Sequence, residues 1–354
     1  PYGSMAVMSL VVPNRVSEGK SLPRVEVLVE GMRLKRYGTD GVQIDEVFTS
    51  NPAWILLDVL RRCGWRLQDI DVASFARAAA YCDELIPATD LHGNAILIPR
   101  FQCNLVLQRR RSAADVIRGI RNSARLYLTY STEGKLELRV ENTLALQQPE
   151  KPAGSNSTEP LGSGWPAYEF GDGTSGFSGI VRRPSGEPAL VLTRRSAAET
   201  PNRVTLEFQD AFNEYQQDSI SLVDNGDVLR TGQEISVAAP ALGVPNFHQA
   251  ARVVRLLLDK AIDGNEYIEF ETSVRAVGLR PGDLIAVTYL KEGFDRQPFR
   301  IVKIEPGLNF GRAMITAQIH RDSWYRDDIT EENSGAGRQR PSDVGIPRPL
   351  VGAV

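Results

Sequence analysis

The chain has 354 residues, a formal net charge of −3, and 42% hydrophobic and 24% charged residues. This composition is typical of a soluble globular protein with two or three domains, and the absence of basic excess argues against a dedicated nucleic-acid binder. No run approaches the roughly 20 apolar residues that cross a membrane, so no membrane span is expected. Three cysteines, odd in number and without zinc spacing, predict free thiols, with Cys63 and Cys82 packing on apolar helix faces.

The first part of the chain is predicted to mix strands and helices. Residues 1–23 form an amino-terminal segment, of which the stretch before Met5 is interpreted as a remnant of cloning. Residues 24–34 alternate apolar and polar side chains, which predicts a half-buried strand. A helix is expected over 51–64, where Asn51 is the N-cap, Pro52 takes the first position and Trp54 supplies a large apolar side chain. A second helix is expected over 72–84.

Strand and helix signals continue to residue 146, which closes the first predicted domain, 24–146. Residues 95–108 are predicted to be strand, and Ser112 is predicted to cap a helix over 112–125. Two alternating runs then flank Glu133-Gly134, which predicts a β-hairpin.

Residues 147–200 are rich in Gly, Ser and Pro and show little periodicity, so they are predicted to be a linker or a docking loop. The aromatic residues Trp165, Phe170 and Phe177 suggest that part of this segment docks on another surface.

The second predicted domain, 201–325, is mostly β with one long helix. A strand begins at Asn202, and Asn246 and Gln249 form a capping-box pattern before the helix. The Pro281-Gly282 turn precedes several further strands. Residues 326–354 are charged and then rich in Pro and Gly, as expected for an exposed tether.

The search for chemistry returns no catalytic, cofactor-binding or metal-binding residue. His92, His248 and His320 stand in unrelated contexts, and "DNGD" at 224–227 lacks the downstream Glu of a calcium loop and is explained by a tight turn. The "RRR" run at 109–111 fits a solvated surface or a subunit interface better than a phosphate site, although phosphates or an acidic partner surface remain the alternative. We therefore expect no enzyme activity and no cofactor.

The order of the motifs resembles a known family. "TSNPAWILLDVLRRCGW", "IDVASFARAAAYCDE", the 112–140 unit, "NFHQAARVVRLLLDK" and "LRPGDLIAVTY" follow one another as in the central tail hub, or tail-tip attachment, proteins of long-tailed bacteriophages and related prophage or gene-transfer particles. The resemblance covers about residues 24–325. It implies an α+β fold in which a mixed helix-hairpin domain precedes a mostly antiparallel, barrel-like β domain with one long helix.

The same resemblance implies a structural virion protein that closes the distal end of the tail tube. Its expected partners are copies of itself in a homo-trimer, a distal tail ring protein, the tape-measure end, and fibre or receptor-binding proteins. It would be made in the bacterial host cytoplasm and reside at the virion tail tip. Two alternatives stay open: a tail-associated cell-wall hydrolase or peptidase, and a host-surface binding module acting through residues 165–177.

Within this resemblance the Asn-Pro-Ala-Trp and Pro-Gly-Asp motifs are the most recognisable. Asn51, Pro52 and Trp54, together with Pro281, Gly282 and Asp283, are therefore the architectural or interface candidates, beside the aromatic residues of the linker. For Trp54 we favour a place in the core over one at a subunit interface.

Overall fold

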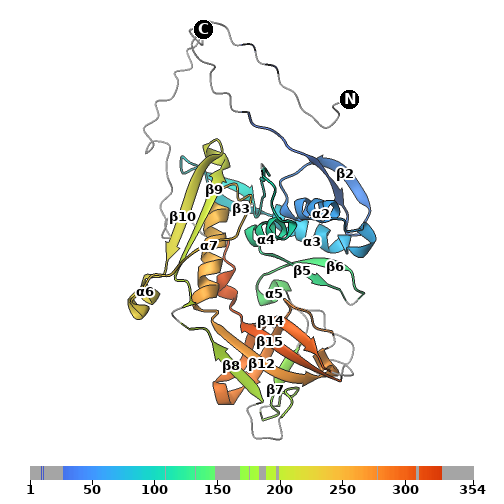
Figure 1. The fold of residues 1–354 in the computed structure, drawn as a ribbon, viewed down its shortest axis with the longest axis vertical. Helices are drawn as coiled ribbons and strands as arrows, with labels where there is room; N and C mark the ends of the chain where they lie inside the picture. The colour runs from blue at the N-terminus through green and yellow to red at the C-terminus, as the bar shows by residue number, and fades with distance from the viewer. Residues whose placement is uncertain are drawn as a thin grey trace.

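The computed structural model describes residues 9, 11, 27–107, 109–131, 133–147, 168–174, 176–182, 189–196, 199–276, 278–307 and 311–328. Two parts are distinguished here: an amino-terminal half, residues 27–147, and a carboxy-terminal half, residues 168–328. Figure 1 shows the amino-terminal half as helices and short hairpins, and the carboxy-terminal half as two sheets joined by one long helix.

The amino-terminal half consists of three hairpins and three main helices. Its strands are β1 Arg33–Tyr37, β2 Gln43–Phe48, β3 Leu85–Thr89, β4 Ala95–Pro99, β5 Leu126–Tyr130 and β6 Leu136–Val140. Its helices are α2 Pro52–Arg62, α3 Val72–Asp83, α4 Ala113–Ser123 and the single turn α5 Leu144–Gln147, with a 3-10 turn η1 at Leu67–Asp69. The hairpins pair as β1–β2, β3–β4 and β5–β6, each antiparallel.

Local sequence explains where these helices begin. The side chains of Asn51 and Asp71 accept hydrogen bonds from the amides of Ala53 and Ala73, and Ser112 caps α4 in the same way. The three predicted helices are thus confirmed. Their apolar faces meet in one core, where Leu56, Phe75 and Ile120 are fully buried and are joined by side chains of β5 and β6.

The carboxy-terminal half contains two sheets. The larger sheet has the order β7-β13-β14-β15-β12-β8 and is curled like half a barrel. Its strands are β7 Glu169–Gly171, β8 Leu190–Arg194, β12 Glu266–Ser273, β13 Leu284–Tyr289, β14 Phe294–Pro306 and β15 Arg312–Ile319. All neighbours are antiparallel except β7 and β13. Its concave side encloses a separate apolar core around Phe170, Phe270 and Phe299.

The smaller sheet carries the long helix. Strand β9 Arg203–Asp210 lies between β10 Gln216–Val223, which is antiparallel, and β11 Ser236–Ala238, which is parallel. Helix α7, Phe247–Ile262, packs its apolar face on β9 and β10, and the amide of Gln249 donates to the Asn246 side chain as the capping box predicts. Helix α6, Asn225–Thr231, connects β10 to β11. The half is completed by the short 3-10 turns η3 Ala211–Asn213, η4 Val274–Ala276, η5 Leu290–Glu292 and η7 Asp322–Trp324.

The expected α+β class with a barrel-like β part is confirmed, but three local predictions are wrong. Of residues 24–34, those at 27–32 are exposed and outside any strand, because β2 ends at Phe48 and offers no partner beyond Arg33. The strand predicted over 95–108 stops at Pro99. Asp224 begins helix α6, because its side chain accepts from the amide of Asp227, so "DNGD" is a helix start and not a tight turn.

Two strands of the larger sheet, β7 and β8, come from the segment 147–200 that was expected to be a linker or docking loop. These strands are short and lie at the two edges of the sheet. Their side chains alternate too briefly to show a period, which is why sequence alone favoured a loop. Most of the remaining residues of 147–200, Trp165 included, lie outside the described residues.

Candidate functional site at the joint between the halves

The Pro281–Gly282–Asp283 turn lies where the two halves meet. Gly282 has φ +94°, and a Cβ built on it would lie 2.2 Å from Cε2 of Tyr127 on β5. Its carbonyl accepts hydrogen bonds from the side chains of Gln147 at 2.7 Å and Arg300 at 2.9 Å. Only glycine satisfies both the backbone conformation and the close approach. The turn therefore seats one half directly on the other.

Two ion pairs flank this turn and join it to β6. Asp283, only 2% exposed, pairs with Arg139 and also accepts from the amide of Arg280 at 2.9 Å. The Arg280 side chain in turn pairs with Glu137. A buried carboxylate is tolerated only with such partners, so Asp283 needs both halves to be in place.

Glu141, which follows β6, is the centre of a second buried cluster. It accepts a hydrogen bond from the Tyr325 hydroxyl at 2.5 Å, pairs with Lys260 of α7, and lies 3.7 Å from Nε of Arg300. Burial opposes ionisation of Glu141, but the two cations and the hydroxyl outweigh it and hold its pKa below its usual value. Burial also lowers the pKa of Lys260. The cluster is stable as an ionised set, with members from both halves.

A third cluster, which we name the arginine cage, consists of Arg100, Arg125 and Arg252 around the carboxylate of Asp327. The distances to Asp327 are 2.9 Å from Nε of Arg100, 3.2 Å from Nη1 of Arg125 and 3.3 Å from Nη1 of Arg252. The side chains of Arg125 and Arg252 are 1% exposed. Burial lowers the pKa of Arg252 to about 10. The ring of Phe101 lies under two of the guanidinium groups. Its centroid is 4.8 Å from Cζ of Arg252 and 5.5 Å from Cζ of Arg125.

The first turn of α7 completes the joint. The side chain of Gln249 is fully buried, donates to the carbonyls of Gln102 and Ser123 at 2.9 Å each, and accepts from the Gln102 amide at 2.9 Å. His248 contacts the backbone of Thr89 at the end of β3. The polar residues at the start of this helix thus bind backbone of the amino-terminal half, while the apolar face binds the smaller sheet.

The Asn-Pro-Ala-Trp motif lies inside the amino-terminal core. Asn51 is 2% exposed, and besides capping α2 it donates from Nδ2 to the carbonyl of Ala79 at 2.9 Å, which joins α2 to α3. Pro52 is buried at the first helical position. Trp54 is 5% exposed and packs against Tyr37, with ring centroids 6.2 Å apart. In the isolated chain these residues orient helices and β1 relative to one another.

The aromatic residues of the predicted docking loop have different environments. Phe170, on β7, is fully buried, with its ring 5.3 Å from that of Phe270. Phe177 is half-buried, and Cζ of Arg296 lies 5.6 Å from the centroid of its ring. Two of the three residues thus pack within the carboxy-terminal half, and Trp165 lies outside the described residues.

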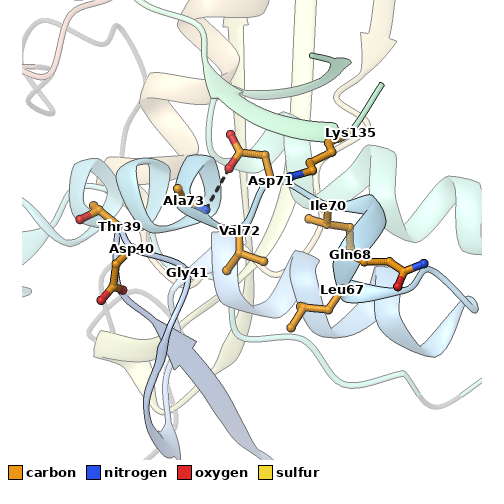
Figure 2. A pocket seen from close by; sticks show the side chains of 10 residues that line it. All are labelled: Thr39, Asp40, Gly41, Leu67, Gln68, Ile70, Asp71, Val72, Ala73 and Lys135. Atoms are coloured by element: carbon orange, nitrogen blue, oxygen red, sulfur yellow. Dashed lines mark hydrogen bonds between the residues drawn. The ribbon is translucent and has the colours of Figure 1, made fainter. Parts of the chain in front are cut away.

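One shallow pocket of about 350 Å³ opens beside the amino terminus of α3. Figure 2 shows Asp71 turned back onto the amide of Ala73, its helix-capping partner, with Asp40 and Lys135 at the rim. Asp40 accepts from the amide of Val42, and Lys135 pairs with Glu133 at 3.7 Å. The ten residues labelled in Figure 2 include no histidine, cysteine or serine, and the side chains of Asp40, Asp71 and Lys135 are engaged by the contacts given above.

The histidines and cysteines are separate from one another. His320 is buried against Tyr325 and Asp322, whereas His92 is exposed. The three cysteines are free, as predicted, but Cys63 is exposed and does not pack as an apolar side chain. In the described part of the chain no group of three or more His, Cys, Asp or Glu residues could hold a metal ion, and no helix there is long and apolar enough to cross a membrane.

Sequence reasoning identified the Pro-Gly-Asp turn but missed most of the joint. The arginines at 100, 125, 139, 252 and 300 lie 75 to 227 positions along the chain from Asp327, Asp283 and Glu141, the carboxylates that they face. A signal was present in α7, where the polar residues Gln249 and Arg252 flank Ala250 and Ala251 in the apolar first half of the helix. Such polar residues on a helix face indicate a contact with something other than the sheet below.

Residues 180–304, about a third of the chain, match the model of a family described as "Putative phage tail protein". None of the curated proteins compared with the chain matches it significantly. Among solved structures, a chain from the virion of a native gene transfer agent particle is 13% identical with a TM-score of 0.52; the match covers 80% of this chain and 50% of that one.

Two further solved structures are similar over smaller parts. The 43 kDa tail protein of prophage MuSo2 from Shewanella oneidensis is 13% identical with a TM-score of 0.37, over 63% of this chain and 58% of that one. A tail protein from Neisseria meningitidis MC58 is 11% identical with a TM-score of 0.37, over 61% of this chain and 56% of that one. The present chain thus spans about half the length of the solved chains it matches. The resemblance to phage tail proteins expected from the motifs is confirmed.

Proposed function

We propose that this chain is a structural protein of a phage or phage-like tail, and more specifically a tail-tip hub subunit. In that role it closes the distal end of the tail tube and connects the tube to fibres or receptor-binding modules. The observation that carries the proposal is the match of residues 180–304 to a family of phage tail proteins, in the same chain whose fold resembles part of a gene transfer agent particle.

The geometry of the joint supports a structural role. The described charged clusters are paired across the two halves and buried, and their ionised partners face one another instead of an open cavity. Such an arrangement orients domains and leaves little free chemistry for a substrate. We propose the same role for the candidate residues: Asn51, Pro52 and Trp54 orient the amino-terminal helices, and Pro281, Gly282 and Asp283 seat the carboxy-terminal half.

The proposed assembly is a homo-trimer at the virion tail tip. Its other partners are a distal tail ring protein, the end of the tape measure, and fibre or receptor-binding proteins. The domain division proposed is a hub domain over 24–146 and a β-rich hub domain over 201–325, whose larger sheet also takes the edge strands β7 and β8 from the segment 147–200.

The first test is light scattering over a concentration series, with and without the tail-tube proteins of the particle. A hub subunit is expected to give three times the mass of the 39.1 kDa chain, or a complex with threefold stoichiometry on addition of the tube. Electron microscopy of particles made without the chain is expected to show tubes with an open or irregular tip. A persistent monomer that binds no tail component would contradict the proposal, and peptidoglycan turnover by the purified chain would favour the hydrolase alternative.

A further inference from the structure

The segment that follows the last strand crosses the joint between the halves. We name residues 321–328 the strap. Asp322 accepts from the amide of Leu144 at 2.8 Å and lies 2.9 Å from Nε2 of His320. Trp324 is 3% exposed in the core of the larger sheet. The strap therefore makes contacts in both halves within three residues.

The second part of the strap adds six contacts. Tyr325 donates to Glu141 at 2.5 Å and accepts from Arg300 at 3.1 Å. The carbonyl of Arg326 accepts from Arg125 at 2.7 Å. Asp327 then enters the arginine cage, which takes Arg100 and Arg125 from the amino-terminal half and Arg252 from α7. One carboxylate thus links both halves and the long helix.

Asp327 supplies the negative charge that faces all three arginines of the cage. Three guanidinium groups converge on it, and the other carboxylate paired in the cage is Glu84, which binds Arg100 from a position that is 60% exposed. Without Asp327, the buried cations Arg125 and Arg252 would face each other across the joint with no anion between them. Like charges that are buried repel strongly because the interior screens them little.

We propose that the strap is a conformational lock: while Asp327 is seated in the arginine cage the halves are held together, and when it leaves, repulsion among the cage arginines loosens the joint. Asp327 is 29% exposed, whereas the side chains of Arg125 and Arg252 around it are 1% exposed. The lock is a property of the chain alone and does not depend on the proposed function.

The test is hydrogen exchange of the full chain with Asp327→Asn, which keeps the shape of the side chain and removes its charge. The lock predicts that amides at the joint, such as those of Gln102 and Leu144, exchange at least about tenfold faster, because opening of the halves exposes them to solvent. Amides of β13–β15 in the centre of the larger sheet should keep wild-type rates. Asp295→Asn, the same change at an exposed carboxylate, is the matched control and should change nothing.

Two further variants separate repulsion from the loss of a contact. Arg100→Gln, introduced into the Asp327→Asn chain, removes one cage cation whose remaining carboxylate partner is on the surface, and it should restore at least part of the lost protection. Asp327→Glu keeps the anion and should remain close to wild type. Unchanged exchange in Asp327→Asn, uniformly faster exchange over the whole chain, or a further loss of protection on adding Arg100→Gln would each overturn the lock.

Discussion

Substitution of Gly282 by alanine tests whether the Pro-Gly-Asp turn seats one half on the other. The new Cβ would lie 2.2 Å from Cε2 and 2.6 Å from Cζ of Tyr127, distances at which real carbon atoms do not pack. The residue also has φ +94°, which strains any side chain. Strain of the alanine backbone at this positive φ costs about 1–2 kcal/mol. Forced repacking around the Tyr127 ring adds about 1–3 kcal/mol. We therefore expect a loss of about 2–5 kcal/mol in the free energy of unfolding.

The control is Gly293→Ala, which has a similar φ of +79° but no atom within 4 Å of the new Cβ. It should lose only the free energy of unfolding that the backbone strain costs, about 1–2 kcal/mol. Urea unfolding followed by fluorescence and by circular dichroism measures both variants. The difference between them isolates the contact with Tyr127, and equal destabilisation of the two variants would refute the seating of the turn on β5.

Three further predictions concern buried polar groups. Burial lowers the pKa of His320, so below about pH 6.5 the unfolded chain binds more protons than the folded chain and stability should be lost as the pH falls. The variant His320→Gln should therefore flatten the slope of the urea midpoint against pH. The control His92→Gln, at an exposed position, should leave this slope unchanged. Glu141→Gln leaves Lys260 and Arg300 without their carboxylate and should cost about 3 kcal/mol in thermal unfolding, whereas Glu305→Gln, 57% exposed, should cost less than about 0.5 kcal/mol. Asn51→Ala removes the α2 cap and leaves the Ala79 carbonyl without its donor, so a loss of about 2 kcal/mol is expected, and a stability equal to wild type would contradict the role assigned to Asn51.

The elements that were predicted well are those with a local cause. The cap residues Asn51, Ser112 and Asn246 act on amides two or three positions away, so the sequence contains all the partners of the interaction. The β5–β6 hairpin is similar, because Gly134 has φ +77° and directs the turn itself. The match between motif order and a tail-protein fold also follows from such local signals taken together.

Two of the wrong predictions involve elements whose partners are distant, whereas the start of α6 was missed although its cap, Asp224, acts on the nearby amide of Asp227. Residues 27–32 alternate as a strand should, yet a strand exists only where another backbone pairs with it, and β2 ends too early. Strands β7 and β8 lack a clear pattern, and they form because β13 and β12 offer open edges more than 70 residues later. Pairing of this kind is decided by the tertiary structure and not by the segment alone.

The amino-acid sequence by itself determined helices α2, α3, α4 and α7, their caps, the turn of the β5–β6 hairpin and the Pro-Gly-Asp motif, because each depends on hydrogen bonds or backbone angles within a few residues. Only the tertiary structure decided what the motif contacts, and why Asp283, Glu141 and Asp327 can be buried as charges. In the contacts made across the joint, their arginine and lysine partners are 119 to 227 positions away in the chain. A carboxylate is indistinguishable in sequence from a solvated surface charge until folding brings these cations to it.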